Sequence, residues 1–363
     1  MVKEGGIVEV SAAGEKMGML KELKAEGYER LVAWEDTSAR LTAVIAIHST
    51  ARGPALGGCR MWPYPSLDDA VQDVLRLSKA MTYKTAIAGL RLGGGKTVIL
   101  GDSKQDKTPE LLRSLGEFIN TFEGRYFGAE DVGLTVKDIE NIRQETKYMT
   151  GASEESGGSG DPSILTALGV FRGIQVCLKE KFGEDSIKDR SITIQGVGKV
   201  GGRLAELLHE AGAQLILSDL DQEQADLIAQ RLDAETVPEQ KALEVFCDVL
   251  APCALGGVIH SKTATRLKCQ IVAGGANNQL ADDHYGDVLA QREILYAPDY
   301  VMNAGGLISV AREVEGYSKE EAIKKTEALA DTLANLFELS RKEGMAPHRA
   351  ANRLAEERLT SNR

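Results

Sequence analysis

A glycine fingerprint at residues 191–201 restricts the possible folds of this chain more than any other feature. The run Ser191-Ile-Thr-Ile-Gln leads directly into the pattern G-x-G-x-x-G at Gly196, Gly198 and Gly201. This order predicts a strand, a tight turn and a helix whose free N–H groups bind a pyrophosphate. Gly196 permits the turn, Gly198 lets the backbone approach the phosphates, and Gly201 allows the helix to pack closely on the strand. The intervening Val197, Lys199 and Val200 belong to the same predicted cofactor loop.

An acidic residue follows the next predicted strand, Gln214–Ser218. Asp219 lies close to the expected spacing of roughly 20 residues after the glycines. A carboxylate there would accept hydrogen bonds from the ribose hydroxyls and repel a 2′-phosphate, which favours NAD over NADP. Asp221 adds negative charge, and Arg231 is expected to lie too far away to reverse the preference. The alternative is a turn that serves packing alone, with Asp219 as a helix cap.

Strands and helices alternate throughout the second half of the chain. Alternation of this kind predicts a parallel, doubly wound sheet, so the fold class is α/β. Besides those above, we expect strands at 248–251, 270–273 and 294–296, and helices at 164–182, 201–211 and 222–232, with the chain helical from Ser318 onward.

A stretch rich in glycine and serine, residues 151–160, predicts a hinge between two domains. We expect an α/β domain at 1–150 and a Rossmann-type domain at 151–339, with a cleft between them. The C-terminal helix, about 340–363, could cross back to the first domain. In that domain, strands are expected to open the fold at 31–34 and 41–47, and helices to begin at Ser66, Thr108 and Thr135, each of which can cap a helix.

Composition excludes several classes of function. The 363 residues include 43 Lys plus Arg and 54 Asp plus Glu, a formal net charge of −11, which disfavours binding to nucleic acid or to anionic membranes. The five cysteines are scattered and form no C-x-x-C pair, so neither a disulfide framework nor a structural zinc site is expected. With no apolar run of signal-peptide or transmembrane length, we expect a cytoplasmic protein without a metal site.

Two short motifs in the first half carry groups suited to proton transfer. Three glycines precede Lys96, but the P-loop spacing fails and a strand begins at Thr97. A lysine held by a glycine turn at a strand edge can be partly desolvated, as acid–base chemistry requires; the alternative is a solvated surface lysine. Asp131 lies in an acidic turn, Ala129–Gly133, where a carboxylate could carry protons or could merely belong to the helix entry.

Six motifs together resemble the Glu/Leu/Phe/Val dehydrogenase family, over nearly the whole chain and most closely its leucine dehydrogenases. They are Gly53-Pro-Ala-Leu-Gly-Gly-Cys-Arg-Met-Trp62, Met81-Thr-Tyr-Lys84, Gly93-Gly-Gly-Lys96, Ala129-Glu-Asp131-Val-Gly133, Gly274-Gly-Ala-Asn-Asn-Gln279 and Tyr296-Ala-Pro-Asp-Tyr-Val-Met-Asn-Ala-Gly-Gly306. The resemblance implies NAD-dependent, reversible oxidative deamination of an L-amino acid to a 2-oxo acid and ammonia. It also implies a homo-oligomer, often an octamer.

The resemblance also implies roles for individual residues. Lys96 would be the catalytic lysine that polarises the carbonyl and activates water, and Asp131 the carboxylate that shuttles protons to and from the amine. Lys84 would bind the substrate carboxylate, helped by Asn278 and the backbone at Gly57 and Gly58. The side-chain pocket would be formed by Leu56, Met81, Ala129, Leu307 and Val310, and further cofactor contacts by Thr166, Cys253, Ala254, Asn277 and Asn303.

Three features depart from the family pattern. Family members often have alanine at the third glycine of the Gly93–Gly95 run and threonine at position 59, and the N-terminal extension is longer than expected.

The apolar pocket favours leucine, then isoleucine and valine. A phenylalanine, valine or tryptophan dehydrogenase on the same scaffold is the alternative enzyme, and an inactive NAD-binding regulatory protein is the alternative outside enzymes.

Overall fold

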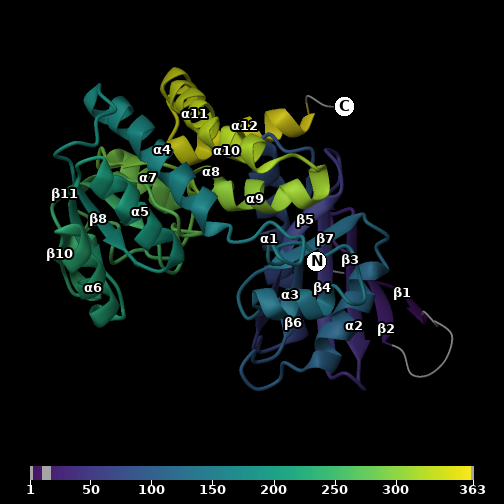
Figure 1. Cartoon of the computed structure of the whole chain (residues 1–363). Helices are drawn as coiled ribbons and strands as arrows, with labels where there is room; N and C mark the ends of the chain where they lie inside the picture. The colour runs from purple at the N-terminus through teal and green to yellow at the C-terminus, as the bar shows by residue number, and fades with distance from the viewer. Residues whose placement is uncertain (1–2, 10–17, 361–363) are drawn as a thin grey trace. The chain divides into compact units, whose positions relative to one another are not determined.

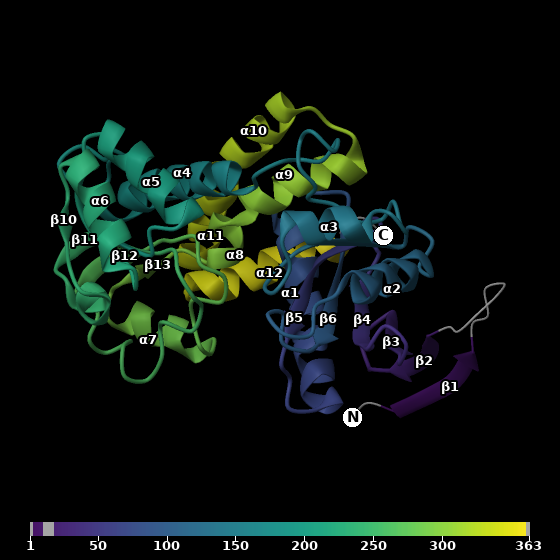
Figure 2. The same cartoon turned by 60° about the horizontal axis from the view of Figure 1, so that its bottom comes forward.

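The computed structural model describes residues 3–9 and 18–360, so the predicted N-terminal extension lies partly outside the described residues. These residues form two compact units (Figures 1 and 2). Unit 1 comprises the described parts of Met1–Asp161, Val310–Gly316 and Glu357–Arg363, and unit 2 comprises Pro162–Ser309 and Tyr317–Glu356. None of the helices in the described ranges is long and apolar enough to cross a bilayer.

Unit 1 is built on a mixed sheet in the order β1-β2-β3-β4-β6-β5-β7. From β1 to β6 neighbouring strands are antiparallel, whereas β5 runs parallel to both β6 and β7. The strands are β1 (Lys3–Glu9), β2 (Met19–Lys24), β3 (Arg30–Asp36), β4 (Leu41–Ser49), β5 (Ala55–Trp62), β6 (Gly93–Leu100) and β7 (Tyr126–Glu130), and the helices are α1 (Leu67–Ile87), α2 (Pro109–Asn120) and α3 (Val136–Ile142).

Alternation along the strands gives this sheet two apolar faces. Val44 and Val98 belong to the cluster that contains Val74 of α1. Their neighbours Ile45 and Ile99 belong to the opposite cluster, with residues of α2 and α3. Because successive side chains point to opposite faces, one strand supplies both cores. Each such burial contributes about 1.5–3 kcal/mol, so helices on both faces stabilise the strands that carry the site.

The predicted glycine turn before Lys96 is wrong. Gly93–Leu100 form β6, a strand inside the sheet. A Cβ on Gly94 would lie 2.1 Å from the backbone nitrogen of Thr82 in α1, and one on Gly93 would lie 2.0 Å from the carbonyl oxygen of Ser49. The glycines therefore allow α1 and the neighbouring chain to approach the strand. The strands expected to open the fold are present as β3 and β4, but β1 and β2 precede them.

Unit 2 confirms the predicted Rossmann-type architecture. Its sheet has the order β10-β9-β8-β11-β12-β13, and every pairing is parallel. The strands are β8 (Ser191–Gln195), β9 (Gln214–Ser218), β10 (Glu235–Thr236), β11 (Cys247–Pro252), β12 (Cys269–Val272) and β13 (Leu295–Tyr296). The helices are α4 (Ser163–Phe182), α5 (Lys199–Glu210), α6 (Gln222–Leu232), α7 (His284–Gln291), α8 (Asp299–Met302), α9 (Ala304–Glu315), α10 (Lys319–Glu327), α11 (Leu329–Glu343) and α12 (Pro347–Thr360), with a 3₁₀ helix at Glu239–Glu244. The last residues of α9, from Val310, and of α12, from Glu357, belong to unit 1.

Helix α5 begins at Lys199, two residues before the predicted start at Gly201. Gly201 therefore lies inside the helix, where a Cβ would come 1.8 Å from the carbonyl oxygen of Gly196. The glycine lets the first turn of α5 pack directly on the loop that leaves β8, which is its predicted role. This contact fixes where the N–H groups at the start of the helix point.

Candidate active site

Lys96 and Asp131 form a buried ion pair at the centre of unit 1. Lys96 lies in β6 and Asp131 follows β7, with β5 between these strands. The Lys96 Nζ donates a hydrogen bond to Asp131 Oδ2, and the side chains are only 7% and 20% exposed. A Cβ on Gly58 of β5 would lie 2.7 Å from the Asp131 Cβ and 3.0 Å from Lys96 Nζ. Glycine at position 58 therefore leaves the space that the pair occupies.

The electrostatic surroundings of Asp131 keep its carboxylate ionised. Burial acts to raise its pKa, but the positive charges of Lys96 and Arg60, with hydrogen bonds from Lys96 and from the Val132 backbone, outweigh burial and lower the pKa to about 2. At neutral pH the carboxylate is therefore charged and can accept hydrogen bonds.

Tyr126 links the three parallel strands next to this pair. Its hydroxyl donates to the carbonyl oxygen of Gly57 at 2.9 Å and accepts from the Thr97 hydroxyl, also at 2.9 Å. Burial raises the pKa of Tyr126 well above its ordinary value, so the phenol stays neutral. The bonds hold the backbone at Gly57, one of the predicted carboxylate-binding positions.

Arg60 also contacts Asp131, although it had no predicted role. Its Nε lies 3.4 Å from Asp131 Oδ2, and its Nη1 donates to Asp73 Oδ2 at 3.2 Å. The signal in the sequence is its place two residues after Gly58, because alternate residues of a strand share a face. What the sequence lacks is any sign that α1 brings Asp73 to the same point.

The predicted substrate residues divide between the two units. Lys84 lies partly buried in the last turn of α1, and Leu56 is fully buried in β5. Met81, Ala129 and Val310 also belong to unit 1, whereas Leu307 and Asn278 belong to unit 2. Asn278 is exposed and has a φ of 52°, the left-handed conformation that asparagine tolerates better than most residues. The group of substrate residues in unit 1 and the group in unit 2 are therefore each described within their own unit.

The predicted nucleotide loop of unit 2 has the features that a pyrophosphate requires. Gly196 has a φ of +93°, and no atom lies within 4 Å of a Cβ placed on Gly198, so the backbone there is open. The N-cap of α5 carries no side-chain hydrogen bond. Lys199 at its first turn is exposed, whereas Val197 is buried and Val200 half-buried. Helix N–H groups are thus available to an anion.

Asp219 lies at the carboxyl end of β9 and is fixed by the backbone. Its Oδ2 accepts from the N–H of Val197 at 2.7 Å, and its Oδ1 accepts from the N–H of Asp221 at 3.0 Å. The carboxylate therefore adjoins the glycine loop.

A second group of predicted cofactor residues surrounds the ends of β11 and β12. Asn303 donates to Asn277 Oδ1 at 2.8 Å and to the Gly275 carbonyl at 3.2 Å, while its own Oδ1 is buried without a hydrogen-bond partner among the described residues. Ala254 lies against the Cβ position of Gly196. A buried amide oxygen without a partner among the described residues fits a ligand that donates hydrogen bonds, as a nicotinamide does.

Thr166 and Cys253, two further predicted cofactor residues, each donate a hydrogen bond to a nearby backbone carbonyl. The Thr166 hydroxyl donates to the Pro162 carbonyl at 2.9 Å, and the Cys253 N–H donates to the Gln195 carbonyl at 2.7 Å. Burial raises the pKa of the Cys253 thiol to about 11, so this cysteine is neutral.

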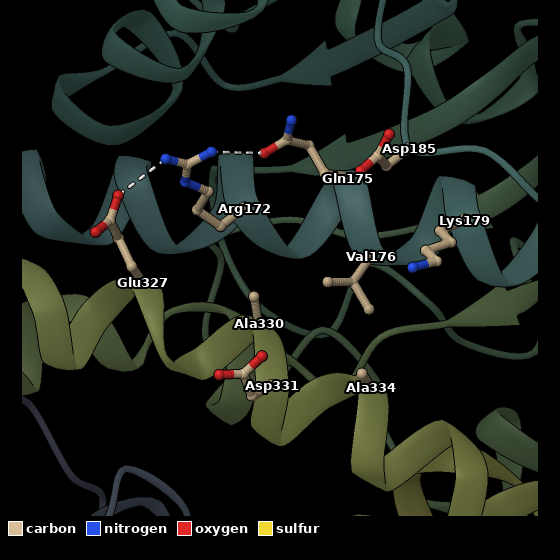
Figure 3. Close-up of a pocket in the computed structure, with 9 residues that line it drawn as sticks. All are labelled: Arg172, Gln175, Val176, Lys179, Asp185, Glu327, Ala330, Asp331 and Ala334. Atoms are coloured by element: carbon tan, nitrogen blue, oxygen red, sulfur yellow. Dashed lines mark hydrogen bonds and ion pairs between the residues drawn. The ribbon is translucent and has the colours of Figure 1, made fainter.

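A cavity of about 450 Å³ lies elsewhere, between α4 and the helices α10 and α11 (Figure 3). Arg172 on α4 donates to Gln175 at 3.1 Å and pairs with Glu327 of α10 at 2.9 Å. Both ionised side chains are about 40% exposed, so the pair fastens two helices weakly. None of the predicted site residues lines this cavity, which does not belong to the site.

Comparison with known proteins supports the family resemblance of the sequence motifs. Residues 29–148 match the family model described as Glu/Leu/Phe/Val dehydrogenase, dimerisation domain, and residues 157–222 and 217–362 match Glutamate/Leucine/Phenylalanine/Valine dehydrogenase. A leucine dehydrogenase of Thermoactinomyces intermedius is 50% identical over 92% of this chain and 91% of its own length. A phenylalanine dehydrogenase of the same organism is 43% identical over 92% of each.

A solved structure agrees in fold. The crystal structure of L-tryptophan dehydrogenase from Nostoc punctiforme matches with a TM-score of 0.82 and 39% identity, over 93% of this chain and 97% of that one. The resemblance seen in the motifs is therefore confirmed. The chain belongs to the Glu/Leu/Phe/Val dehydrogenase family and is an amino-acid dehydrogenase.

Proposed function

We propose that this protein catalyses the NAD-dependent, reversible oxidative deamination of L-leucine, and more slowly of other branched-chain L-amino acids, to 2-oxo acids and ammonia. The observation that carries the proposal is the buried Lys96–Asp131 pair beside Gly58. Its support from relatives is the 50% identity to a leucine dehydrogenase over most of both chains.

The two residues of the pair have complementary tasks in this reaction. Asp131 accepts hydrogen bonds from the substrate ammonium group and, through the family's proton relay with Lys96, takes part in moving protons to and from the amine. Lys96 polarises the carbonyl of the 2-oxo acid and activates the water that attacks the imino acid left by hydride loss. Lys84 pairs with the α-carboxylate, so that the Cα–H bond is correctly placed. Bound NAD supplies the hydride acceptor.

Enzymes of this family use NAD or NADP, and we propose NAD for this chain. Asp219 places a fixed negative charge next to the loop where the ribose is expected, and Asp221 follows it. A 2′-phosphate would be repelled there. Comparison of kcat/KM for the two cofactors tests the preference, which we expect to exceed tenfold; equal values would mean that Asp219 does not face the ribose.

The side-chain preference rests on five apolar residues: Leu56, Met81, Ala129, Leu307 and Val310. They offer no charge or hydrogen bond, so a glutamate side chain would lose its hydration without compensation. One methylene changes binding by only about 1–3 kcal/mol, which makes valine and isoleucine secondary substrates rather than excluded ones. Helix α9 carries Leu307 and Val310 three positions apart, on one face.

A substrate panel tests this preference. We expect kcat/KM to fall in the order leucine, then isoleucine and valine, with phenylalanine well behind. The second candidate is a phenylalanine or tryptophan dehydrogenase, favoured by the identities of 43% and 39% to such enzymes. If phenylalanine or tryptophan outperforms leucine, the second candidate replaces the first.

We also propose a homo-oligomer, possibly an octamer. The support is the description of the matched N-terminal family model as a dimerisation domain. Light scattering at several protein concentrations should give a mass that is a multiple of the 39.1 kDa chain.

A further inference from the structure

Arg60 connects the proposed catalytic pair to a second carboxylate. Its guanidinium lies between Asp131, at 3.4 Å, and Asp73 of α1, at 3.2 Å. All three side chains are about one-fifth exposed, from 18% to 21%. The result is a row of alternating charges that runs from Asp73 through Arg60 and Asp131 to Lys96.

The far end of this row is itself fixed. The Tyr64 hydroxyl donates to Asp73 Oδ2 at 2.7 Å. Arg76 donates to the other carboxylate oxygen of Asp73 at 2.8 Å, but it is 56% exposed and belongs to the outer side of the row. The Arg60 Nε is buried and has no hydrogen-bond partner among the described residues, although it faces Asp131. Arg60 and Asp131 therefore form an ion pair without a hydrogen bond, and the Arg60 Nε–H remains able to donate one.

We propose that Arg60 is a positioning residue that holds the Asp131 carboxylate directed toward Lys96 and supplies a constant positive charge beside it during turnover. The proposal rests on the proposed function of Lys96 and Asp131. A lysine engaged in proton transfer changes its charge within the cycle, whereas a guanidinium cannot be deprotonated in a protein. Arg60 therefore supplies the constant part of the field at Asp131, and Asp73 with Tyr64 fixes where that charge lies.

The other titratable groups near Asp131 do not replace this charge. Cys59 of β5 and Tyr126 of β7 are fully buried, and burial raises the pKa of each, so both are neutral at working pH. Glu130 precedes Asp131 on β7 and is exposed. The charged groups that remain are Lys96 of β6 and Arg60 of β5, together with Asp73 behind Arg60.

The test compares three substitutions, Arg60→Met, Arg60→Lys and Arg76→Met, in the full-length enzyme. The measurements are kcat and KM for leucine and NAD and the pH profile of kcat/KM. Arg60→Met should lower kcat at least tenfold with an unchanged KM for NAD, and should move the acid limb upward by about 1 pH unit or more, since an adjacent arginine lowers a carboxyl pKa by roughly 1–3 units. Arg76→Met removes an exposed charge from the same Asp73 and should behave as wild type.

Arg60→Lys separates charge from geometry. It keeps the positive charge, so the acid limb should stay near wild type, but one ammonium cannot span two carboxylates, and kcat should fall several-fold. An unchanged pH profile in Arg60→Met, or wild-type kcat in Arg60→Lys, would overturn the proposal; the second result decides if Arg60→Met does not fold. Lys96→Ala and Asp131→Asn run alongside, because activity retained by those variants would refute the proposed function itself.

Discussion

Among single residues, Lys96 has the most direct role in the proposed reaction, and its substitution gives the clearest test. Lys96→Ala should reduce kcat at least 100-fold, the lower end of what one acid–base group contributes. NAD binding, followed by fluorescence titration, should persist because the glycine loop lies in unit 2. Lys84→Ala should instead raise KM for leucine most visibly. Near-normal turnover by the Lys96 variant would remove this residue from the mechanism.

The lowered pKa of Asp131, also a property of a single residue, leads us to expect that stability depends on pH. Its pKa is lowered in the folded protein from 3.8 to about 2, so its stabilising effect is complete above pH 3.8 and is lost as the pH falls toward 2. Asp131→Asn leaves Lys96 and Arg60 without their shared anion and should lower the free energy of unfolding by about 3 kcal/mol at neutral pH. Urea unfolding of both proteins should show this difference shrinking on acidification. A difference that grows in acid would contradict the assignment.

At the scale of elements, the C-terminal end of α1 depends on a residue late in the sequence. Arg358 of α12 donates to the carbonyl oxygens of Ile87 and Ala86, and Arg52 donates to the Arg358 carbonyl at 2.9 Å. Carbonyls in the last turn of a helix lack the usual intrahelical partner, and Arg358 adds a side-chain donor to this turn. Arg358→Ala should therefore lower stability by about 1–3 kcal/mol and raise KM for leucine, because α1 carries Lys84. Arg353→Ala, an exposed change on the same helix, is the control, and equal effects of the two would refute this role.

Elements set by local pattern were predictable, and those set by distant contacts were not. Ser191–Gln195, Gln214–Ser218 and Gln222–Leu232 match the structure residue for residue, because period, turn glycines and caps all lie within a few positions. The predicted capping residue Thr135 forms a full capping box with Asp138. The strand at Gly93–Gly95 could not be predicted from the sequence, because its glycines are required by close contacts with α1 and with the end of β4.

The candidate site shows the same division. The glycine fingerprint with Asp219, and the Lys96 and Asp131 motifs, are visible along the chain. Arg60 and Asp73 are not, because a helix must cross the sheet to bring them together, and spacing of 13 residues carries no such information. The motif-based roles of the other site residues stay predictions until variants are measured.

For the whole molecule, a single assay measures the oxidation of an amino acid coupled to the reduction of NAD. The purified protein is given L-leucine and NAD, and reduced nicotinamide, ammonia and the 2-oxo acid are each quantified. We expect all three in equal amounts, with little or no product when NADP replaces NAD or when the Lys96→Ala variant replaces the wild type. Absence of reduced nicotinamide with leucine and with every other apolar L-amino acid would contradict this expectation.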